Sequence, residues 1–356
     1  MEFSLTILPG DGIGPDIVAA AVEVVKAADL RFNLSLELEV ADSGLSSLEK
    51  NGSTLPEETW GKILAADGVI LGPCHTAIYP APEQGGINPS ARLRTGLDLY
   101  ANIRPSKIRP GVTAHVKEMD LIIARENTEG FYADRNMHQG SGEFMPTEDM
   151  VLAIRKITRR GSEQIARQAC ELASKRRGLL SIVHKANVMK VSDGFFVDIC
   201  KEVADDYKLE VDEYLVDAMA ALLVRKPDYF DVIVTTNMFG DIISDLAAEL
   251  SGGLGLGPSV NAGDKYAMAQ AAHGSAPDIA GQNIANPTAM ILSAGMLLDT
   301  LGSRLNRPEL LEAAKQIDEA IDAQLSEEGG RTPDLGGPLG TDAFGVGVAE
   351  KVRGGT

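Results

Sequence analysis

The chain has 356 residues, 44% of them hydrophobic, and its 51 acidic side chains outnumber 33 basic ones to leave a formal net charge of −18. This length predicts about two domains with sizeable hydrophobic cores. The acidic balance, with no basic patch interleaved with aromatic residues, argues against nucleic acid and anionic membranes as partners.

The three cysteines are sparse, odd in number and never spaced as C-x-x-C, which predicts a reducing, cytoplasmic location. The first residues lack a basic segment and a cleavage site, so we expect no signal peptide. The most apolar helical stretch, residues 287–302, is too short to span a bilayer and includes Asp299. It is predicted to be a buried helix.

The first motif is ILPGDGIGPDI, residues 7–17, which follows a short apolar stretch. The dinucleotide fingerprint G-x-G-x-x-G would require glycine or alanine where Pro15 stands. Glycines supply unusual backbone angles and proline suits a first helical turn, so the motif predicts a strand, a tight turn and a helix. These residues alone leave open whether the turn is a ligand loop or a plain connection.

Further along, apolar β-branched runs alternate with helical patterns, which predicts an α/β fold on a mainly parallel sheet. Strands are expected at residues 68–72, 120–124, 179–184 and 231–237. Helices are expected at residues 150–176, 192–207 and 307–328. The polar stretch 137–150 is predicted to be a loop or a projecting arm, and 329–347 a loop.

The strongest local signal is a carboxylate pair, Asp241 and Asp245, that follows the expected strand 231–237. We expect a helix to begin near Gly240, so that both side chains share one helix face. Like charges at that spacing repel by about 0.2–0.5 kcal/mol. A cation that prefers oxygen ligands, Mg²⁺ or Mn²⁺, would reverse this repulsion. The spacing equally fits a helix cap at Asp241 and a solvated Asp245.

Arginines form a second set: Arg94, Arg104 and Arg125, with Tyr132 seven residues after the last. Arg125 follows a buried type of strand, where an unpaired charge is costly. Guanidinium groups bind carboxylates through two hydrogen bonds, so these residues are candidates for binding an anionic substrate. Surface ion pairs are the commoner role of arginine, and a lone tyrosine usually packs.

Two further segments contain candidate groups. Lys185 lies where the strand 179–184 ends, and a lysine near other cations can lose its proton near neutral pH. An ordinary solvated lysine is the alternative, and His184 beside it is expected to be a packed core residue. In AAHGSAPDIAGQNIANP, Asp278 stands in a loop where an acid could bind ribose hydroxyls and repel a 2′-phosphate.

Taken in order, these segments resemble the isocitrate/3-isopropylmalate dehydrogenase family of β-decarboxylating hydroxyacid dehydrogenases, which includes homoisocitrate and tartrate/D-malate dehydrogenases. The matching segments cover nearly the whole chain and are GDGIGP, LRTGLDLYANIRP, RENTEGFY, HKANVMK, GDIISD, HGSAPDIAGQNIANP and the late DLGG with GT. The resemblance implies the α/β fold of that family, with two domains around a central cleft, which is not a Rossmann fold. It implies a discontinuous cofactor-side domain, residues 1–98 plus 250–356, and a dimerising, metal- and substrate-binding domain, residues 99–249.

The resemblance also implies an activity: oxidative decarboxylation of a (2R)-malate-type 2-hydroxy diacid with NAD and Mg²⁺ or Mn²⁺. Tyr132 would protonate carbon after CO₂ leaves, and Lys185 would help to deprotonate the C2 hydroxyl. The metal ligands would be Asp241, Asp245 and Asp217, the last of which could instead relay protons. In the family Lys185 and Asp217 reach the site from the other subunit, so a homodimer is implied. The substrate-binding residues would be Arg94, Arg104, Arg125, Asn88 and Ser90, and the cofactor-binding residues Ile13, His273, Gly274, Ala276, Asp278, Ile279 and Asn286.

Two positions depart from the family pattern. Gln270 stands three residues before His273, where relatives often have an acid. The substrate-selecting segment NPSARL lacks the leucine-rich stretch of isopropylmalate enzymes, so Asn88, Ser90 and Arg92 indicate a polar, charged or small C3 substituent. Isocitrate, homoisocitrate, D-malate and tartrate remain open as substrates, and 3-isopropylmalate is less favoured. Asp278 and Ile279 stand where NADP-using relatives tend to carry Lys and Tyr, which favours NAD.

Two other functions compete with this one. A non-catalytic regulatory subunit of an isocitrate dehydrogenase-like complex would be expected to lose acid-base or metal residues, whereas Tyr132, Lys185, Asp217, Asp241 and Asp245 are all present. A metal-dependent phosphate-transfer enzyme would need a phosphate-binding motif, and the sequence has no P-loop.

Overall fold

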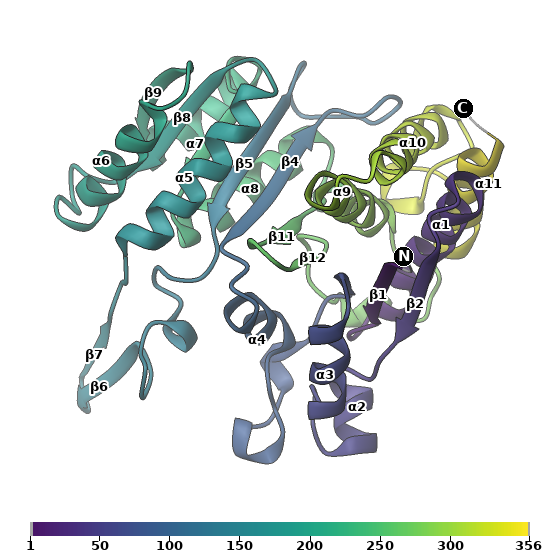
Figure 1. Ribbon diagram of the computed structural model, residues 1–356, viewed down its shortest axis with the longest axis horizontal. Helices are drawn as coiled ribbons and strands as arrows, with labels where there is room; N and C mark the ends of the chain where they lie inside the picture. Colours follow the sequence, from purple (N-terminus) through teal and green to yellow (C-terminus); the bar gives the residue numbers. More distant parts are fainter. Residues whose placement is uncertain (1–2, 355–356) are drawn as a thin grey trace. The chain divides into compact units, whose positions relative to one another are not determined.

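A computed structural model describes residues 3–354. The chain divides into two compact units. The first unit comprises the described residues of Met1–Leu93, Arg109–Thr113 and Gly252–Thr356, and the second comprises Arg94–Ile108 and Ala114–Ser251. Each unit combines strands of a mixed sheet with covering helices, so the predicted α/β class is confirmed (Figure 1). Among residues 3–354 no helix combines the length and the apolar character needed to cross a membrane.

The first unit holds five strands in the order β2-β1-β3-β12-β11. Their bounds are Phe3–Leu8 for β1, Leu36–Val40 for β2, Gly68–Leu71 for β3, Val260–Ala262 for β11 and Ala267–Ala269 for β12. Strands β1, β2, β3 and β12 pair in parallel, and β11 pairs with β12 in the antiparallel sense. The helices are α1 (Gly14–Phe32), α2 (Gly44–Asn51), α3 (Glu57–Ala65), α9 (Thr288–Leu305), α10 (Pro308–Ser326) and α11 (Thr341–Gly354).

Two predictions for this unit are confirmed. The apolar stretch that begins at residue 287 forms α9, which is buried along most of its length. The opening motif is a strand–turn–helix, in which Gly10 and Gly12 have φ angles of +73° and +59° and Pro15 lies in the first turn of α1. A Cβ on Gly12 would lie 2.0 Å from the carbonyl oxygen of Ser275, so the turn packs directly against the segment that contains Ser275.

The second unit holds five strands in the order β4-β5-β10-β8-β9. Their bounds are Ala101–Lys107 for β4, Asp120–Glu126 for β5, Leu179–His184 for β8, Glu210–Leu215 for β9 and Val232–Thr235 for β10. All pairs are parallel except β4 with β5. Figure 1 shows α5 (Arg159–Ser174) and α6 (Ser192–Ala204) in front of these strands, and α7 (Val216–Arg225) and α8 (Asn237–Ser251) behind them. Helix α4 (Pro89–Gly96) crosses the boundary between the units in sequence.

The carboxyl end of β10 leads directly into α8. Strand β10 contributes Ile233 to a core cluster that also includes Ile123 of β5, Val183 of β8 and Ile243 of α8. The expected strand 231–237 is thus confirmed in its interior, but it ends at Thr235 and α8 begins at Asn237 rather than near Gly240. The buried, apolar face of α8 holds its first turn against the end of the strand.

The stretch between β5 and α5 differs from the expectation. Residues 150–176 were predicted to be one helix, and this was wrong for the first part: Met150–Ala153 is strand β7, which pairs with β6 (Glu143–Thr147) in a hairpin, and α5 begins at Arg159. The apolar residues of β7 are all exposed, so no core pulls them into a helix. Thr158 caps α5 by accepting the N–H of Gly161 at 3.1 Å, which places the helix start there. In Figure 1 the hairpin projects from the second unit as the predicted arm.

Candidate active site

Two arginines and two aspartates meet within the second unit. Arg104 comes from β4, Arg125 from β5, and Asp241 and Asp245 from one face of α8. The guanidinium of Arg125 binds Asp241, and that of Arg104 lies 3.2 Å from both Asp241 Oδ1 and Asp245 Oδ1. Both arginines are buried, whereas the aspartate side chains are 40% and 50% exposed. The carboxylates therefore face the buried guanidinium groups of Arg104 and Arg125 on one side and solvent on the other.

Three buried polar residues that the sequence analysis did not single out hold these arginines. Asn237 accepts from Nε of Arg125 at 3.0 Å and from Nη2 at 2.7 Å through Oδ1, and its own Nδ2 donates to the Glu129 carbonyl. Asn102 accepts from Nε of Arg104 at 2.7 Å, and Ser244 accepts from its Nη1 at 2.8 Å. Buried hydrogen-bond acceptors thus fix the orientation of both guanidinium groups.

Tyr132 joins the same cluster. Its hydroxyl accepts from Nη2 of Arg125 at 2.7 Å and donates to Oδ2 of Asp241 at 2.6 Å. The guanidinium of Arg135 lies 4.8 Å from the centre of its ring. Burial raises the pKa of Tyr132 although the charge of Arg125 opposes the shift, so the phenol keeps its proton at neutral pH.

The pKa shifts show an excess of positive charge here. Burial, then the charges of Arg125, Arg135 and Arg104, hold the pKa of Arg94 well below its usual range. Burial and the charge of Arg104 lower the pKa of Arg125 to about 10. Burial disfavours ionisation of Asp241, but the charges of Arg125 and Arg104 outweigh it and the pKa of this carboxyl is lowered. Arg94, Arg104 and Arg125 all lower the pKa of Asp241 and outnumber the two carboxylates of Asp241 and Asp245, so an additional anion would be stabilised at this site.

Lys185 and Asp217 form a separate pair in the second unit. Lys185 follows β8, Asp217 lies in the first turn of α7, and their side chains form an ion pair. The side chain of Asp217 is 66% exposed, and the hydrogen bond from Lys185 lowers its pKa. The two groups are held together at the surface.

The structure does not collect the three predicted metal ligands in one chain. Over residues 3–354 no cluster of three or more His, Cys, Asp or Glu residues is arranged to hold a metal ion. Asp241 and Asp245 do present two carboxylates on one helix face, and burial together with the charge of Asp241 raises the pKa of Asp245 despite Arg104. Hard cations such as Mg²⁺ prefer carboxylate oxygens. Asp241 and Asp245 could therefore bind such a cation if further ligands come from residues outside this cluster.

The predicted cofactor residues lie in the first unit, and two of their segments are in contact. The backbone N–H of Ile13 donates to the Ser275 carbonyl at 2.9 Å, which joins the opening turn to the segment that begins at His273. Nε2 of His273 is buried without a hydrogen-bond partner within residues 3–354, and burial lowers the pKa of this imidazole. An unsatisfied buried ring nitrogen beside a glycine turn fits a ligand that offers a hydrogen bond.

The rest of this segment is ordered by its own contacts. Ala276 has a φ of +37°, a short helical turn Pro277–Ile279 carries the exposed Asp278, and Gly274 is exposed. Asn286 is buried, donates to Asp334 at 3.0 Å and accepts from the Thr288 N–H at 3.0 Å. Asp334 belongs to the late DLGG segment, so that segment supports a predicted cofactor residue.

The substrate-selecting segment has specific partners. Oδ1 of Asn88 accepts from the Ala91 N–H at 3.1 Å at the start of α4, and Ser90 donates to Oε1 of the buried Gln270 at 3.0 Å. Arg92 is exposed, and its guanidinium lies 4.6 Å from the centre of the Trp60 ring. Gln270, which replaces the usual acid, is therefore a partner of Ser90.

Residues 4–348 match the family model described as isocitrate/isopropylmalate dehydrogenase. The chain belongs to the isocitrate/isopropylmalate dehydrogenase family.

Two curated members of the isocitrate/isopropylmalate dehydrogenase family illustrate the match. The chain is 45% identical over 356 residues to the isocitrate/homoisocitrate dehydrogenase of Thermus thermophilus, with 99% of each chain covered. It is 43% identical to the 3-isopropylmalate dehydrogenase of Archaeoglobus fulgidus, with 97% of this chain and 98% of the relative covered. The crystal structure of isocitrate dehydrogenase from Methylococcus capsulatus superposes with a TM-score of 0.87 at 39% identity and covers 99% of each chain.

Membership confirms the family resemblance and the fold that it implied. The protein is a decarboxylating dehydrogenase that acts on hydroxy acids, and its family generally uses a divalent metal and NAD(P) and is typically dimeric. The supporting residues Asn102, Asn237 and Ser244 had a usable signal in the sequence. Asn102 shares a strand face with Arg104 at a spacing of two, and Ser244 lies one helical turn from Asp241. Asn237 follows a buried strand, where a polar side chain needs a partner.

Substitution of Gly240, which lies beside Arg125, would test how closely the arginine–aspartate cluster is packed. A Cβ on Gly240 would lie 2.6 Å from Cγ of Arg125, whereas a Cβ on Gly61 in α3 would meet nothing within 4 Å. Alanine favours a helix over glycine by about 1 kcal/mol, so Gly61→Ala should stabilise the fold and leave turnover unchanged. Gly240→Ala should displace Arg125 and lower kcat/KM by about 100-fold, as misplaced site residues do. Wild-type kinetics for Gly240→Ala would contradict this packing.

Proposed function

We propose that the enzyme catalyses NAD- and Mg²⁺- or Mn²⁺-dependent oxidative decarboxylation of a (2R)-malate-type 2-hydroxy diacid. The observation that carries the proposal is the cluster of Arg94, Arg104 and Arg125 with Asp241 and Tyr132, because buried guanidinium groups in excess over carboxylates suit an anionic substrate. The three arginines would bind the carboxylates of the diacid and orient its C2 hydroxyl.

The substituent at C3 is proposed to be polar, charged or small. Asn88 and Ser90 occupy the selecting segment, and their contacts with Ala91 and Gln270 hold both side chains in polar surroundings. Isocitrate, homoisocitrate and D-malate or tartrate fit such a segment better than 3-isopropylmalate, whose branched group would require apolar contacts. Arg92 stacks on Trp60, so we assign selection to Asn88 and Ser90 rather than to Arg92.

Metal binding is assigned to Asp241 and Asp245 of one subunit and Asp217 of the other. The first two share the exposed side of the cluster, and the Asp217 side chain is more exposed than either, as a ligand donated across an interface would be before assembly. When bound, the metal would act as a Lewis acid that favours loss of the C2 hydroxyl proton and electron accumulation after CO₂ leaves.

Two side chains are proposed to move protons. Lys185 would take the proton of the C2 hydroxyl, with Asp217 as its ion-pair partner. Tyr132 would donate its phenolic proton to carbon after decarboxylation, because its hydroxyl lies at the carboxylate cluster and Arg125 holds it in place. NAD, when bound, would supply a nicotinamide ring that accepts the hydride from C2. The cofactor is assigned to the loops that contain Ile13, His273, Gly274, Ala276, Asp278, Ile279 and Asn286.

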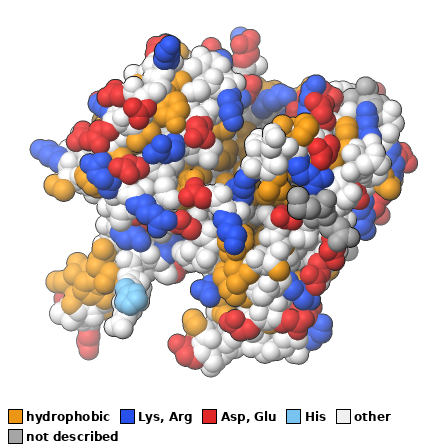
Figure 2. Space-filling model, in the orientation of Figure 1, with side chains coloured by type: hydrophobic (Ala, Val, Ile, Leu, Met, Phe, Trp, Pro, Cys, Tyr) orange, Lys and Arg blue, Asp and Glu red, His pale blue; other side chains and the backbone are white. Residues whose placement is uncertain are grey.

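A homodimer follows from the same assignments. Exposed apolar side chains gather on the β6–β7 arm of the second unit, as Figure 2 shows at its lower left; they are Phe144, Met145, Met150, Val151 and Leu152. Such a patch marks an interaction surface. We propose that the second unit dimerises through this patch and that the first unit is the cofactor domain.

The cysteines Cys74, Cys170 and Cys200 are free thiols, which we take to reflect a cytoplasmic location.

Substrate and metal dependence are tested together. Isocitrate, homoisocitrate, D-malate, tartrate and 3-isopropylmalate are supplied in turn with NAD, and NADH absorbance is followed. We expect fastest turnover with a diacid other than 3-isopropylmalate, loss of turnover in excess chelator, and recovery with Mg²⁺ or Mn²⁺. Full turnover in chelator would overturn the metal assignment, and no NADH from any diacid would overturn the activity.

Tyr132→Phe should separate the two half-reactions. The phenol is needed to protonate carbon, so overall turnover should fall by about 100-fold or more, as loss of a general acid does. Rapid-mixing measurement of NADH formation in the first turnover should show a smaller loss. Tyr207→Phe, a change just beyond α6 in the same unit, serves as the control and should keep both rates. An unchanged steady-state rate in Tyr132→Phe would remove this residue from the mechanism.

Asp278 should make NAD the better cofactor. A carboxylate repels a 2′-phosphate by about 1 kcal/mol at 4 Å in water and by about 4 kcal/mol at an effective dielectric constant of 20. Asp278 is exposed, so the lower figure applies, and kcat/KM should favour NAD by about tenfold. The double variant Asp278→Lys, Ile279→Tyr should narrow or invert that ratio, whereas Asp264→Lys, an exposed change between β11 and β12, should leave it unchanged. Equal use of NADP by the wild-type enzyme would contradict the assignment.

A further inference from the structure

Asp193 is a buried carboxylate that neither the sequence motifs nor the proposed function uses. It lies in the first turn of α6 and is 0% exposed. One oxygen, Oδ1, binds the guanidinium of Arg155, and the other, Oδ2, accepts the backbone N–H of Lys185 at 2.5 Å. The carboxylate therefore ties the residue proposed to take the substrate proton to an arginine.

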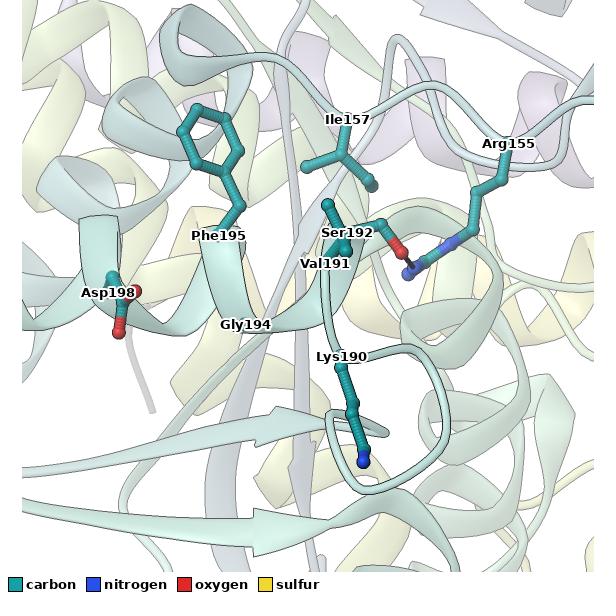
Figure 3. A pocket seen from close by; sticks show the side chains of 8 residues that line it. All are labelled: Arg155, Ile157, Lys190, Val191, Ser192, Gly194, Phe195 and Asp198. Carbon is teal, nitrogen blue, oxygen red and sulfur yellow. Dashed lines mark hydrogen bonds between the residues drawn. The ribbon is translucent and has the colours of Figure 1, made fainter.

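Arg155 is fixed in turn by several elements. It follows β7 by two residues, where the arm rejoins the second unit. Its Nη1 donates to Ser192 Oγ at 3.0 Å, drawn as the dashed line in Figure 3, and its Nη2 donates to Thr236 Oγ1 at 3.0 Å. The same guanidinium lies 5.5 Å from the ring centre of Phe131 and 5.4 Å from that of Phe239. It therefore links the base of the arm, the start of α6 and the turn before α8.

The turn between Lys185 and Asp193 is closed by backbone hydrogen bonds. The Lys185 carbonyl accepts the N–H groups of Val188 and Met189 at 3.0 and 2.9 Å, and the Met189 carbonyl accepts that of Asp193 at 3.0 Å. Figure 3 shows the following residues, from Lys190 through Val191 to Ser192, along a hollow of about 450 Å³ whose lining includes Arg155. The backbone N–H of Lys185, the first residue of the turn, is bound by Asp193, so this carboxylate joins the start of α6 to the start of the turn.

We propose that Asp193, held by Arg155, is a positioning residue that fixes the backbone of Lys185 and so directs its amine to the C2 hydroxyl. The inference rests on the proposed function of Lys185. A buried ion pair is weak evidence for stability, because the cost of removing two charges from water can exceed their attraction. The arrangement instead suits a role in orientation, because the two oxygens of Asp193 bind two different segments, one at Arg155 and one at Lys185.

The variant Asp193→Asn exploits that geometry. The two donors face different oxygens of the carboxylate, and a carboxamide replaces one of these oxygens by an NH2 group, which would face the Arg155 guanidinium or the Lys185 N–H as a second donor. We expect kcat to fall by about 10- to 100-fold, as when a catalytic group is misplaced by about 1 Å. KM for the diacid should change little, because the arginines bind the substrate. Arg155→Lys should act in the same direction, since one ammonium cannot reproduce the fork that contacts Asp193, Ser192 and Thr236.

The chain offers a matched control in Asp231. This carboxylate is also 0% exposed, accepts from Nε of Arg176 at 2.7 Å through Oδ1, and accepts the Arg177 N–H at 2.8 Å through Oδ2. It precedes β10, at the opposite end of the strand from α8. Asp231→Asn should therefore lower Tm as Asp193→Asn does, but leave kcat unchanged.

All variants are assayed with the diacid that the wild-type enzyme oxidises fastest among the five tested above. Sedimentation checks that each variant assembles into the same oligomer as the wild-type enzyme. Lys185→Met alone tests the proposed function, and the double variant Lys185→Met, Asp193→Asn tests the inference. If Asp193 acts through Lys185, the double variant should be no slower than Lys185→Met. Wild-type kcat in both Asp193→Asn and Arg155→Lys, or a fully additive loss in the double variant, would overturn the inference alone. Full turnover in Lys185→Met would overturn the function of Lys185 and the inference with it.

Discussion

The ion pair between Arg125 and Asp241 is the interaction on which the site depends. Arg125 is almost fully buried at the end of a central strand, and a buried guanidinium requires a counter-charge and hydrogen-bond acceptors on all its edges. Asp241 provides the charge from the first turns of α8, which begins two residues after β10 ends. The register of β5 beside β10 pairs Arg125 with Thr235, and so brings the start of α8 and its carboxylates next to Arg125.

A chain of buried polar contacts extends from this pair into the second unit. Asn237 bridges Arg125 and the carbonyl of Glu129, whose carboxylate accepts the N–H and hydroxyl of Thr158 at the start of α5. Burial, with the nearby charge of Glu126, raises the pKa of Glu129 to about 7. Asp193 provides a second such link, from the base of the arm to Lys185. Arg125 and Lys185 are thus each held by a side chain, Asn237 or Asp193, that is not assigned to substrate binding.

In the first unit, the loops assigned to the cofactor are held together mainly by close contacts between backbone segments. A Cβ on Gly12 would collide with the Ser275 carbonyl, and one on Gly14 would lie 2.3 Å from the Pro9 carbonyl. These contacts allow the opening turn to lie against the segment from His273, and Asp11 reinforces them by accepting from the Leu45 N–H at 2.7 Å and the His75 N–H at 2.8 Å. Two loops distant in sequence are thereby brought into contact, and both contain residues proposed to bind the cofactor.

The sequence by itself determined the α/β class, the interior of the main strands, the family and the residue types of the site, because these follow from local periodicity and from motifs in fixed order. It did not place the start of α5, where Thr158 caps the helix and also binds Glu129, a residue distant in sequence. It did not reveal Asp193, because an acidic residue in the first turn of a helix is common and does not by itself indicate a partner. Only the tertiary structure decided which arginine meets which carboxylate: Arg104 and Arg125 reach Asp241 from strands more than a hundred residues away, and that pairing arises from sheet order and burial, which no local pattern encodes.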